Sequence, residues 1–359
     1  MTYVRNAWYV AAWAHEVVAD RPVGVRVLNE PIVLWRNAAG ALAAFEDRCI
    51  HRLAPLSLGR CEGEKLRCMY HGLLYDRSGQ VVEIPGQEKL PSRLRVRPYP
   101  VVERHGWVWV WMGEAAAADE GLIPPVMGLD HPDYLLGHGQ LDFAAAAHLV
   151  NENLLDLSHV SFLHASLQFS EAWARQPPKF TKHERSVRTE WWMRNESLKP
   201  GERVDMYTRS DFYVPGVLVV TDRGYPLGTA DKLNGQEPNL EPPPFNIFIH
   251  LISPMTERST RYFYCAGSHR GHGEDAVRAR DSLMGLAEKA FAEDKMMIEA
   301  QQQSIDSTPG WRFIPTINDR GVMLFKQIVE KLAREESTRS SQRAGAEGRA
   351  DISAARTSD

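Results

Sequence analysis

The sequence predicts an α+β protein of two domains, an all-β domain followed by a domain in which helices accompany an antiparallel sheet. A length of 359 residues exceeds the usual size of a single domain. Short β-branched and aromatic runs fill the first third of the chain, and strand-like runs return between Phe180 and Phe263. The segment from Asp275 to Ser304 has the spacing of a long amphipathic helix. Strands and helices in separate stretches are typical of the α+β class.

Residues 1–115 form the first predicted domain. Three runs in it are rich in β-branched or aromatic residues and are bounded by Gly, Asn or Pro, namely Val25–Leu28, Pro31–Trp35 and Gly106–Trp111. Many short strands with turns between them indicate a small β-sandwich or barrel. The acidic, alanine-rich stretch from Gly113 to Gly121 then predicts a linker.

Residues 116–335 form the second predicted domain. The stretch from Ala144 to His164 has helical spacing and precedes the strand-rich part. The Gly- and Pro-rich stretch from Gly224 to Pro244 interrupts these strands, and a lid over a site and a surface insertion are equally consistent with it. Residues 336–359 contain almost no large apolar side chains, so the sequence predicts a disordered tail there.

Charge and composition argue against several functional classes. The formal charge of −4 and the lack of a basic run argue against binding of nucleic acid. No apolar run approaches the length of a membrane span, and the N-terminus lacks the order of a signal peptide. The sequence therefore predicts a cytoplasmic protein without a membrane partner. In a reducing compartment its four cysteines indicate metal binding or packing, and they are Cys49, Cys61, Cys68 and Cys265.

Two short Cys–His pairs form the first candidate site. One residue separates Cys49 from His51, and after sixteen further residues two residues separate Cys68 from His71. Structural zinc sites usually group their cysteines before their histidines, whereas here each loop offers one thiolate and one imidazole. Two such loops can face each other across a two-iron cluster, with both cysteines on one iron and both histidines on the other. A zinc site between the loops is the alternative.

The second candidate site lies between Glu152 and His164. Glu152, Asp156 and His159 have i, i+4, i+7 spacing, which predicts one face of a helix. His164 is five residues past His159, so the helix must bend or end between them if both imidazoles are to reach one metal. Two histidines and a carboxylate are the ligand set of non-haem Fe(II) oxygenases.

The carboxylate for this metal is expected from the predicted helix near the C-terminus. Asp294 falls on the apolar face of that helix, together with Ala287, Ala290 and Phe291. A buried carboxylate needs a cation or a metal to offset its lost hydration. Asp294 is therefore the expected third ligand, and a buried aspartate paired with an arginine is the alternative.

At these residues the chain resembles the Rieske non-haem iron oxygenases, in the branch of vanillate O-demethylase, dicamba monooxygenase and toluenesulfonate methyl-monooxygenase. The C-x-H-x₁₆-C-x₂-H and E-x₃-D-x₂-H-x₄-H patterns and the segment from Phe291 to Asp294 carry the resemblance. It implies a Rieske domain with a [2Fe–2S] cluster on the two Cys–His pairs. It also implies a helix-grip, START-like catalytic domain with a mononuclear Fe(II) at the second site. Ile50 and Met69 depart from the family, which commonly has proline after each cluster cysteine.

The resemblance also implies partners and catalytic roles. Electrons from NAD(P)H are expected through a separate reductase, because the chain has no GxGxxG motif. Related oxygenases are homotrimers in which one subunit's cluster lies near the next subunit's iron. Asp156 matches the acidic residue that links a cluster histidine of a neighbour, here His71, to an iron-ligating histidine, here His159. Asn153 lies beside the ligands and is a further catalytic candidate.

The sequence says least about the substrate. The resemblance implies O₂-dependent hydroxylation of a methyl or methoxy carbon on an aromatic acid. O-demethylation of a vanillate-like methoxybenzoate with release of formaldehyde is the favoured reaction, and methyl hydroxylation of an arylsulfonate is the alternative. A Rieske electron carrier with an inactive second domain is the non-enzyme alternative. Asn246, Phe248 and His250 alternate onto one strand face, so His250 is a candidate for binding the acid group, and a core histidine is an equally good interpretation.

Overall fold

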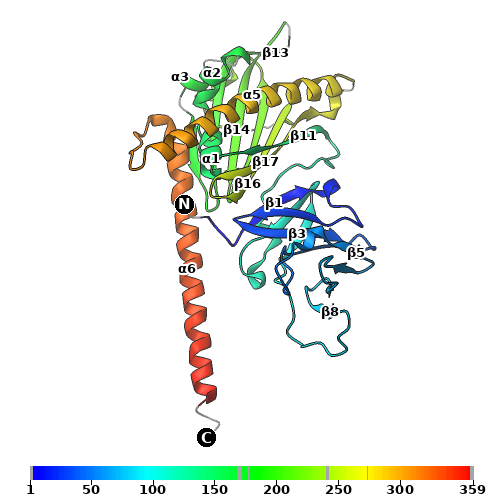
Figure 1. Ribbon diagram of the computed structural model, residues 1–359. Helices are drawn as coiled ribbons and strands as arrows, with labels where there is room; N and C mark the ends of the chain where they lie inside the picture. Colours follow the sequence, from blue (N-terminus) through cyan, green and yellow to red (C-terminus); the bar gives the residue numbers. More distant parts are fainter. Residues whose placement is uncertain are drawn as a thin grey trace.

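The computed structural model describes residues 3–167, 172–176, 178–199, 201–239, 242–272 and 274–355. Its N-terminal domain consists of three small antiparallel sheets (Figure 1). The first sheet has the order β1 (Trp8–Trp13), β10 (Trp107–Trp111), β9 (Val101–Arg104). The second runs β2 (Val23–Val27), β3 (Glu30–Arg36), β4 (Leu42–Glu46), and the third runs β5 (Arg60–Glu62), β6 (Lys65–Arg67), β7 (Leu74–Tyr75), β8 (Val81–Glu83). The runs at Val25, Pro31 and Gly106 are thus confirmed as strand positions.

Short 3-10 helices lie in loops of the N-terminal domain and in the segment that connects the two domains. In the N-terminal domain they are η1 (Ala14–Glu16) and η2 (Leu56–Leu58). The predicted linker contains η3 (Ala115–Ala117) and η4 (Glu120–Leu122).

The C-terminal domain is built on one seven-stranded antiparallel sheet with the order β11-β17-β16-β15-β14-β13-β12. Its strands are β11 (Tyr134–Phe143), β12 (Lys179–Lys182), β13 (Ser186–Lys199), β14 (Glu202–Tyr213), β15 (Val217–Tyr225), β16 (Asn246–Thr256) and β17 (Ser259–His269). Along these strands β-branched and aromatic side chains alternate onto both faces of the sheet, so both faces can pack against other elements. The two faces pack against different partners.

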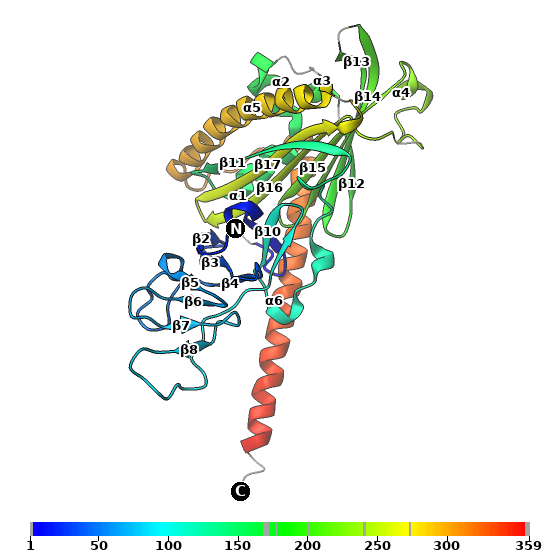
Figure 2. The same ribbon diagram turned by 90° about the vertical axis from the view of Figure 1, so that its right-hand side faces the viewer.

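Helices cover one face of this sheet, as Figure 2 shows for α5. They are α1 (Ala147–Leu155), η5 (Leu157–His159), α2 (Val160–Leu163), η6 (Ala165–Leu167), α3 (Ala172–Arg175), η7 (Arg270–His272), α5 (Glu274–Ser307), η8 (Ile317–Asp319) and α6 (Arg320–Ala355). Helix α4 (Thr229–Lys232) instead packs against Tyr207 of β14, whose side chain lies on the opposite face. The predicted helix at 275–304 is confirmed as α5. The fold is the predicted one, an all-β domain followed by a sheet with helices.

Tryptophans of the N-terminal domain cover the opposite face of the sheet. Trp13 and Trp107 stack with ring centroids 5.4 Å apart, and Trp13 meets Phe263 of β17 edge-on at 5.7 Å. They share one buried cluster with Ile249 and Leu251 of β16. Since Asn246, Phe248 and His250 alternate with these residues along β16, they point to the helical face.

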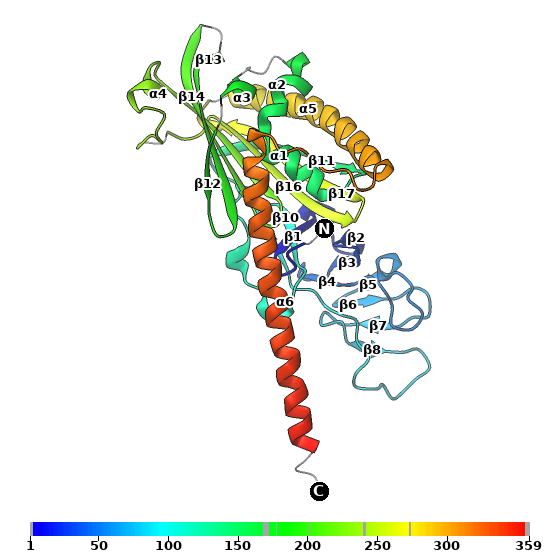
Figure 3. The ribbon, with the colours of Figure 1, turned by 90° about the vertical axis from the view of Figure 1, so that its left-hand side faces the viewer.

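One segment differs from the sequence-based expectation, and the structure adds detail to a second. Residues 336–355 continue helix α6, which projects beyond both domains (Figure 3), where the sequence predicts disorder. Alanine, arginine and glutamate, which have a high helix propensity, are frequent in this tail. The Gly224–Pro244 stretch contains α4 and packs beside Trp192, whose ring N–H donates to the Gln236 carbonyl at 3.0 Å.

No helix among the described residues is both long and apolar enough to cross a membrane.

Candidate functional site

Two loops near β5–β8 bring the predicted Cys–His pairs together, at the end of the N-terminal domain away from the seven-stranded sheet (Figure 1). The thiols of Cys49 and Cys68 are free, buried and in contact. The rings of His51 and His71 are exposed, and their centroids are 4.5 Å apart. Burial raises the pKa of the Cys68 thiol, so a metal is needed to hold it as the thiolate. Inner thiols and outer imidazoles fit a two-iron cluster whose histidine-bound iron lies at the surface.

The loops are supported by main-chain hydrogen bonds that repeat from one loop to the other. The Cys49 N–H donates to the Ala54 carbonyl, and the Cys68 N–H donates to the Leu73 carbonyl, each at 2.8 Å. Gly72 follows His71 at φ +77°, and a Cβ there would lie 2.7 Å from Pro85 Cγ. Glycine is therefore required at this position, because a side chain would both strain the backbone and collide.

Tyr75 explains how the loop at Cys49 tolerates the departure from proline. Its hydroxyl lies 3.1 Å from Cys49 Sγ and accepts the main-chain N–H of Ile50 at 3.2 Å. Proline has no N–H and could not make the second contact. At the other loop Met69 is half-exposed and stands at the surface beside the histidines.

His159, His164 and Asp294 meet at the second site, with one ligand atom from each within 4.8 Å of the others. The Nε2 atoms of the two histidines both lie 3.4 Å from Asp294 Oδ1. This arrangement leaves one side open to the cavity described below. It fits a metal with two imidazoles and one carboxylate on one side and open positions on the other.

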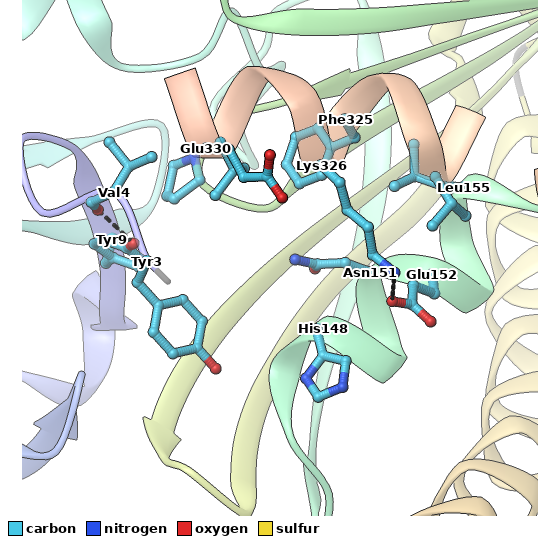
Figure 4. A pocket seen from close by; sticks show the side chains of 13 residues that line it. Tyr3, Val4, Tyr9, His148, Asn151, Glu152, Leu155, Phe325, Lys326 and Glu330 are labelled. Carbon is cyan, nitrogen blue, oxygen red and sulfur yellow. Dashed lines mark hydrogen bonds and ion pairs between the residues drawn. The ribbon is translucent and has the colours of Figure 1, made fainter. Parts of the chain in front are cut away.

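A break in the helix brings the two histidines together. Helix α1 ends at Leu155, and the Asp156 carboxylate then accepts the Ser158 N–H at 3.0 Å and so begins the 3-10 turn η5. The prediction that Glu152, Asp156 and His159 share one helix face is therefore wrong, because no continuous helix joins them. Figure 4 shows Glu152 pointing to the other side of α1, where it pairs with Lys326 at 2.7 Å.

Neighbouring groups hold the metal-facing residues in place. His159 Nδ1 lies 2.6 Å from the Asp156 main-chain carbonyl, and His164 Nδ1 lies 2.7 Å from Glu293 Oε2. Such contacts orient a ligating imidazole and raise its basicity. The Asn153 amide donates to Asp294 Oδ1 at 3.0 Å, which places Asn153 beside the ligands as expected. Sequence reasoning missed Glu293, since it lies off the apolar face of α5.

Contacts within the triad favour the charged forms of Asp294 and His164. Burial opposes ionisation of Asp294, but hydrogen bonds and charge from His159 and His164 outweigh it and hold the pKa of this carboxyl well below its usual value. Burial by itself would lower the pKa of His164, and contacts with Asp294 and Glu293 raise it above its usual value instead. Asp294 is thus a carboxylate at neutral pH, the form that binds a metal.

A largely apolar cavity of about 230 Å³ opens beside the triad, between α5, the α1–α2 segment and strands β14–β16. Side chains of both histidines and of Asp294 line it, together with Leu, Val, Ala and Phe residues. His250 lines it as well, and it contacts the Tyr262 hydroxyl through Nδ1. Burial lowers the pKa of His250 to about 3, so the ring is neutral at pH 7 and offers a hydrogen bond rather than a charge.

Four further lining residues were not singled out in the sequence-based prediction. Asp222 follows Leu218 and Val220 at period two along β15, so all three face the cavity. Trp173 of α3 lines the cavity from the helical side. No residue of the Gly224–Pro244 stretch lines it in the part of the chain that the structure describes, so the lid interpretation finds no support there.

A second cavity of about 340 Å³ lies behind α1, against the N-terminal segment and α6 (Figure 4). His148 and Asn151 project into it from α1, while Tyr3 and Glu330 border it from the other elements. Helix α1 therefore has a metal-facing side, with Asn153, and a side that faces this second cavity.

Comparison with known proteins agrees with both sites. A family model for the Rieske [2Fe–2S] domain matches residues 7–100, and one for the vanillate O-demethylase oxygenase C-terminal domain matches residues 143–335. The iron–sulfur subunit of a toluene-4-sulfonate monooxygenase system from Comamonas testosteroni is 31% identical over 93% of this chain and 98% of its own length. The dicamba O-demethylase oxygenase component of Stenotrophomonas maltophilia is 31% identical over 94% of this chain and 100% of its own length.

A solved structure has the same fold over most of the chain. The crystal structure of dicamba monooxygenase bound to dicamba superposes with a TM-score of 0.78 at 28% identity, covering 94% of this chain and 100% of that one. A second structure of the same enzyme, with non-haem iron and dicamba, superposes with a TM-score of 0.75 over the same shares. The likeness therefore covers both domains.

Proposed function

The chain belongs to the Rieske non-haem iron oxygenases as an oxygenase component, and from this membership we propose that it hydroxylates a methyl or methoxy carbon of an aromatic substrate with O₂. It carries a [2Fe–2S] cluster and a mononuclear iron. The observation that supports the proposal most is the pairing of a metal triad with an adjoining apolar cavity, in a chain that also has the cluster loops.

We assign each metal to the residues that meet at its site. Cys49, Cys68, His51 and His71 would hold the cluster, and His159, His164 and Asp294 would hold the iron. When bound, the iron would activate O₂ for insertion of one oxygen atom into a C–H bond. The chain's own residues orient the ligands, through Glu293 and the Asp156 carbonyl, and the apolar cavity walls exclude water.

The two electrons for this reaction would come from NAD(P)H through a separate reductase, because oxygenase components of multicomponent systems depend on one. Within one subunit the cluster loops and the iron triad lie in different domains (Figure 1). Apolar Leu53, Met69 and Tyr70 are exposed beside the cluster histidines, which is typical of a surface that meets another protein.

We infer a homotrimer in which the cluster of one subunit serves the iron of the next. Identical head-to-tail contacts close into a ring of three. In this arrangement the half-exposed Asp156 would link His71 of the neighbouring subunit to His159. Asn153 would stay a positioning residue on the carboxylate of Asp294.

For the reaction itself we favour O-demethylation of a vanillate-like methoxybenzoate. Oxygen insertion at the methoxy carbon uses O₂, two electrons and two protons and yields a hemiacetal and water. The hemiacetal breaks down to a phenol and formaldehyde. Methyl hydroxylation of an arylsulfonate or another aromatic acid is the second candidate, supported by the toluene-4-sulfonate relative.

A reductase-coupled assay over methoxybenzoates and methyl arylsulfonates tests the proposal. Formaldehyde and the matching phenol are expected from a methoxy substrate, in step with the O₂ consumed, and a benzylic alcohol is expected from a methyl substrate. His159→Ala is the inactive control, since it removes a proposed iron ligand. If the reconstituted enzyme releases only peroxide with every methyl and methoxy aromatic, the proposal fails.

A further inference from the structure

The wall of the metal cavity contains a carboxyl group that the reaction does not use. Asp222 lies on β15 between Thr208 of β14 and Asn246 of β16, which are its direct partners in the sheet register. Thr208 Oγ1 donates to Asp222 Oδ1 at 2.7 Å, and the Asn246 side chain also hydrogen-bonds to this carboxyl. Asp222 and Asn246 both line the cavity.

The neighbouring cation Arg223 follows Asp222 along β15 and so points to the other face of the sheet, away from the cavity. None of the described residues that line the cavity is a lysine or an arginine, and the other titratable groups there are the triad and the neutral His250. Burial raises the pKa of Asp222, while hydrogen bonds from Thr208 and Asn246 and the charge of Arg223 oppose the rise. Whether ionised or neutral, the carboxyl offers more acceptor positions than these two contacts use. A partly buried acceptor in a cavity wall favours a ligand that donates a hydrogen bond.

We propose that Asp222, supported by Asn246 and Thr208, is a specificity-determining residue that accepts a hydrogen bond from an O–H or N–H group on the aromatic substrate. The enzyme then takes methoxylated or methylated phenols, anilines or amides in preference to the same aromatics without a donor. This inference rests on the proposed oxygenase function and adds the substrate class to it.

Hydrogen bonding at Asp222 explains why a substrate with a donor is preferred and why an anionic group is disfavoured there. A site built to hydrogen-bond a substrate hydroxyl discriminates strongly against an analogue that lacks it, because the protein's buried polar group is then left unpaired. A carboxylate or sulfonate directed at Asp222 would place two hydrogen-bond acceptors against each other with no proton to share. When Asp222 is ionised, the two groups would also repel as like charges. The acid group of a vanillate-like substrate would therefore lie elsewhere in the cavity, and its phenol would face Asp222.

Matched substrate pairs test the inference in the holoenzyme. The pairs are 4-hydroxy-3-methoxybenzoate against 3-methoxybenzoate, and 2-methoxyphenol against methoxybenzene. We expect wild-type kcat/KM to be at least about tenfold higher for the donor-bearing member of each pair, mainly through a lower KM. In Asp222→Ala this ratio falls toward one, because the donor-bearing substrate loses its partner while its analogue does not. Equilibrium dialysis of the same four compounds is expected to give the same order of Kd values.

Asp231→Ala is the matched control. This aspartate pairs with Arg194 at the surface on α4 and does not line the cavity, so the wild-type ratio should persist. Asp222→Asn adds a variant of nearly the same size that keeps one acceptor oxygen, and it should fall between wild type and Asp222→Ala.

The two possible failures are distinguishable. Formaldehyde from both members of a pair with equal kcat/KM in wild type, or an unchanged ratio in Asp222→Ala, overturns the inference and leaves the oxygenase function intact. Absence of formaldehyde from all four substrates, together with rapid conversion of a methyl arylsulfonate without a donor, overturns the inference as well. No oxidised product from any aromatic substrate contradicts the proposed function itself.

Discussion

Glu293 of α5 contacts the imidazole nitrogen of His164 that faces away from the proposed metal. This imidazole is almost fully buried, and its Nδ1 lies 2.7 Å from Glu293 Oε2, while its Nε2 faces Asp294. Glu293 and Asp294 are adjacent in α5, so one turn of helix supplies both a proposed metal ligand and the group that orients a second ligand. A substitution at Glu293 should therefore weaken metal binding, although Glu293 is not itself a proposed ligand.

Glu293→Ala is expected to weaken iron binding about ten- to hundredfold, because His164 loses the acceptor that fixes its ring and its tautomer. Anaerobic dialysis against graded ferrous iron, followed by metal analysis, measures the affinity. Glu288→Ala is the control, since Glu288 is exposed on the same helix and should leave the affinity unchanged. An unchanged affinity in Glu293→Ala would show that the contact does not orient His164.

At the level of elements, α6 shows how a helix with a partly polar sequence is held in place. Its first half packs on the helical face of the sheet through Val322, Phe325 and Ile328, which are buried. Phe325 meets Phe212 of β14 edge-on with ring centroids 4.7 Å apart. Aromatic pairs in this edge-on geometry stabilise the fold by more than their buried area alone would.

Phe325→Ala should lower the free energy of unfolding by about 3 kcal/mol, at the lower end for such truncations because the residue also borders a cavity. Urea unfolding followed by circular dichroism measures the change. Met323→Ala, a half-exposed neighbour in the same helix, should shift it by less than about 0.5 kcal/mol. Equal shifts in the two variants would mean that α6 is not held through Phe325.

In the molecule as a whole, the two proposed metal sites lie in separate domains. The tryptophan cluster that joins the domains packs against one face of the large sheet, and the iron triad lies on the other face. The cluster histidines are exposed at the end of the N-terminal domain away from this sheet (Figure 1). The two proposed sites of one subunit therefore lie apart. Assembly is expected to bring the cluster of one subunit close to the iron site of the next.

Mixed trimers test this arrangement. His71→Ala should inactivate the cluster and His159→Ala should inactivate the iron, so each variant alone is expected to be inactive. Coexpression in equal amounts should restore about a quarter of wild-type turnover, because one in four neighbouring pairs combines an intact cluster with an intact iron site across a head-to-tail contact. No recovery in verified mixed trimers would mean that electrons pass within one subunit.

The types and order of the proposed ligands could be predicted from the chain alone, since thiols, imidazoles and a carboxylate at motif spacing are read directly from it. The sequence also predicted the strands at Val25, Pro31 and Gly106 and helix α5, because their periodicity is local. It did not locate the helix end at Leu155, where the Asp156 cap competes with continued helical spacing. The tail was expected to be disordered, whereas helix α6 continues to Ala355, and the alanine, arginine and glutamate residues in it favour a helix.

The groups that surround the proposed metal site and line its cavity became known from the packing of the chain. Glu293 meets His164 across 129 residues of sequence, and Thr208, Asp222 and Asn246 become neighbours through the register of three strands. Contacts of this kind depend on sheet order and on how α5 lies across the sheet, and no local pattern encodes them. The physical reason is that ligand identity is a property of single residues, whereas orientation, burial and charge at a site are properties of the packed chain.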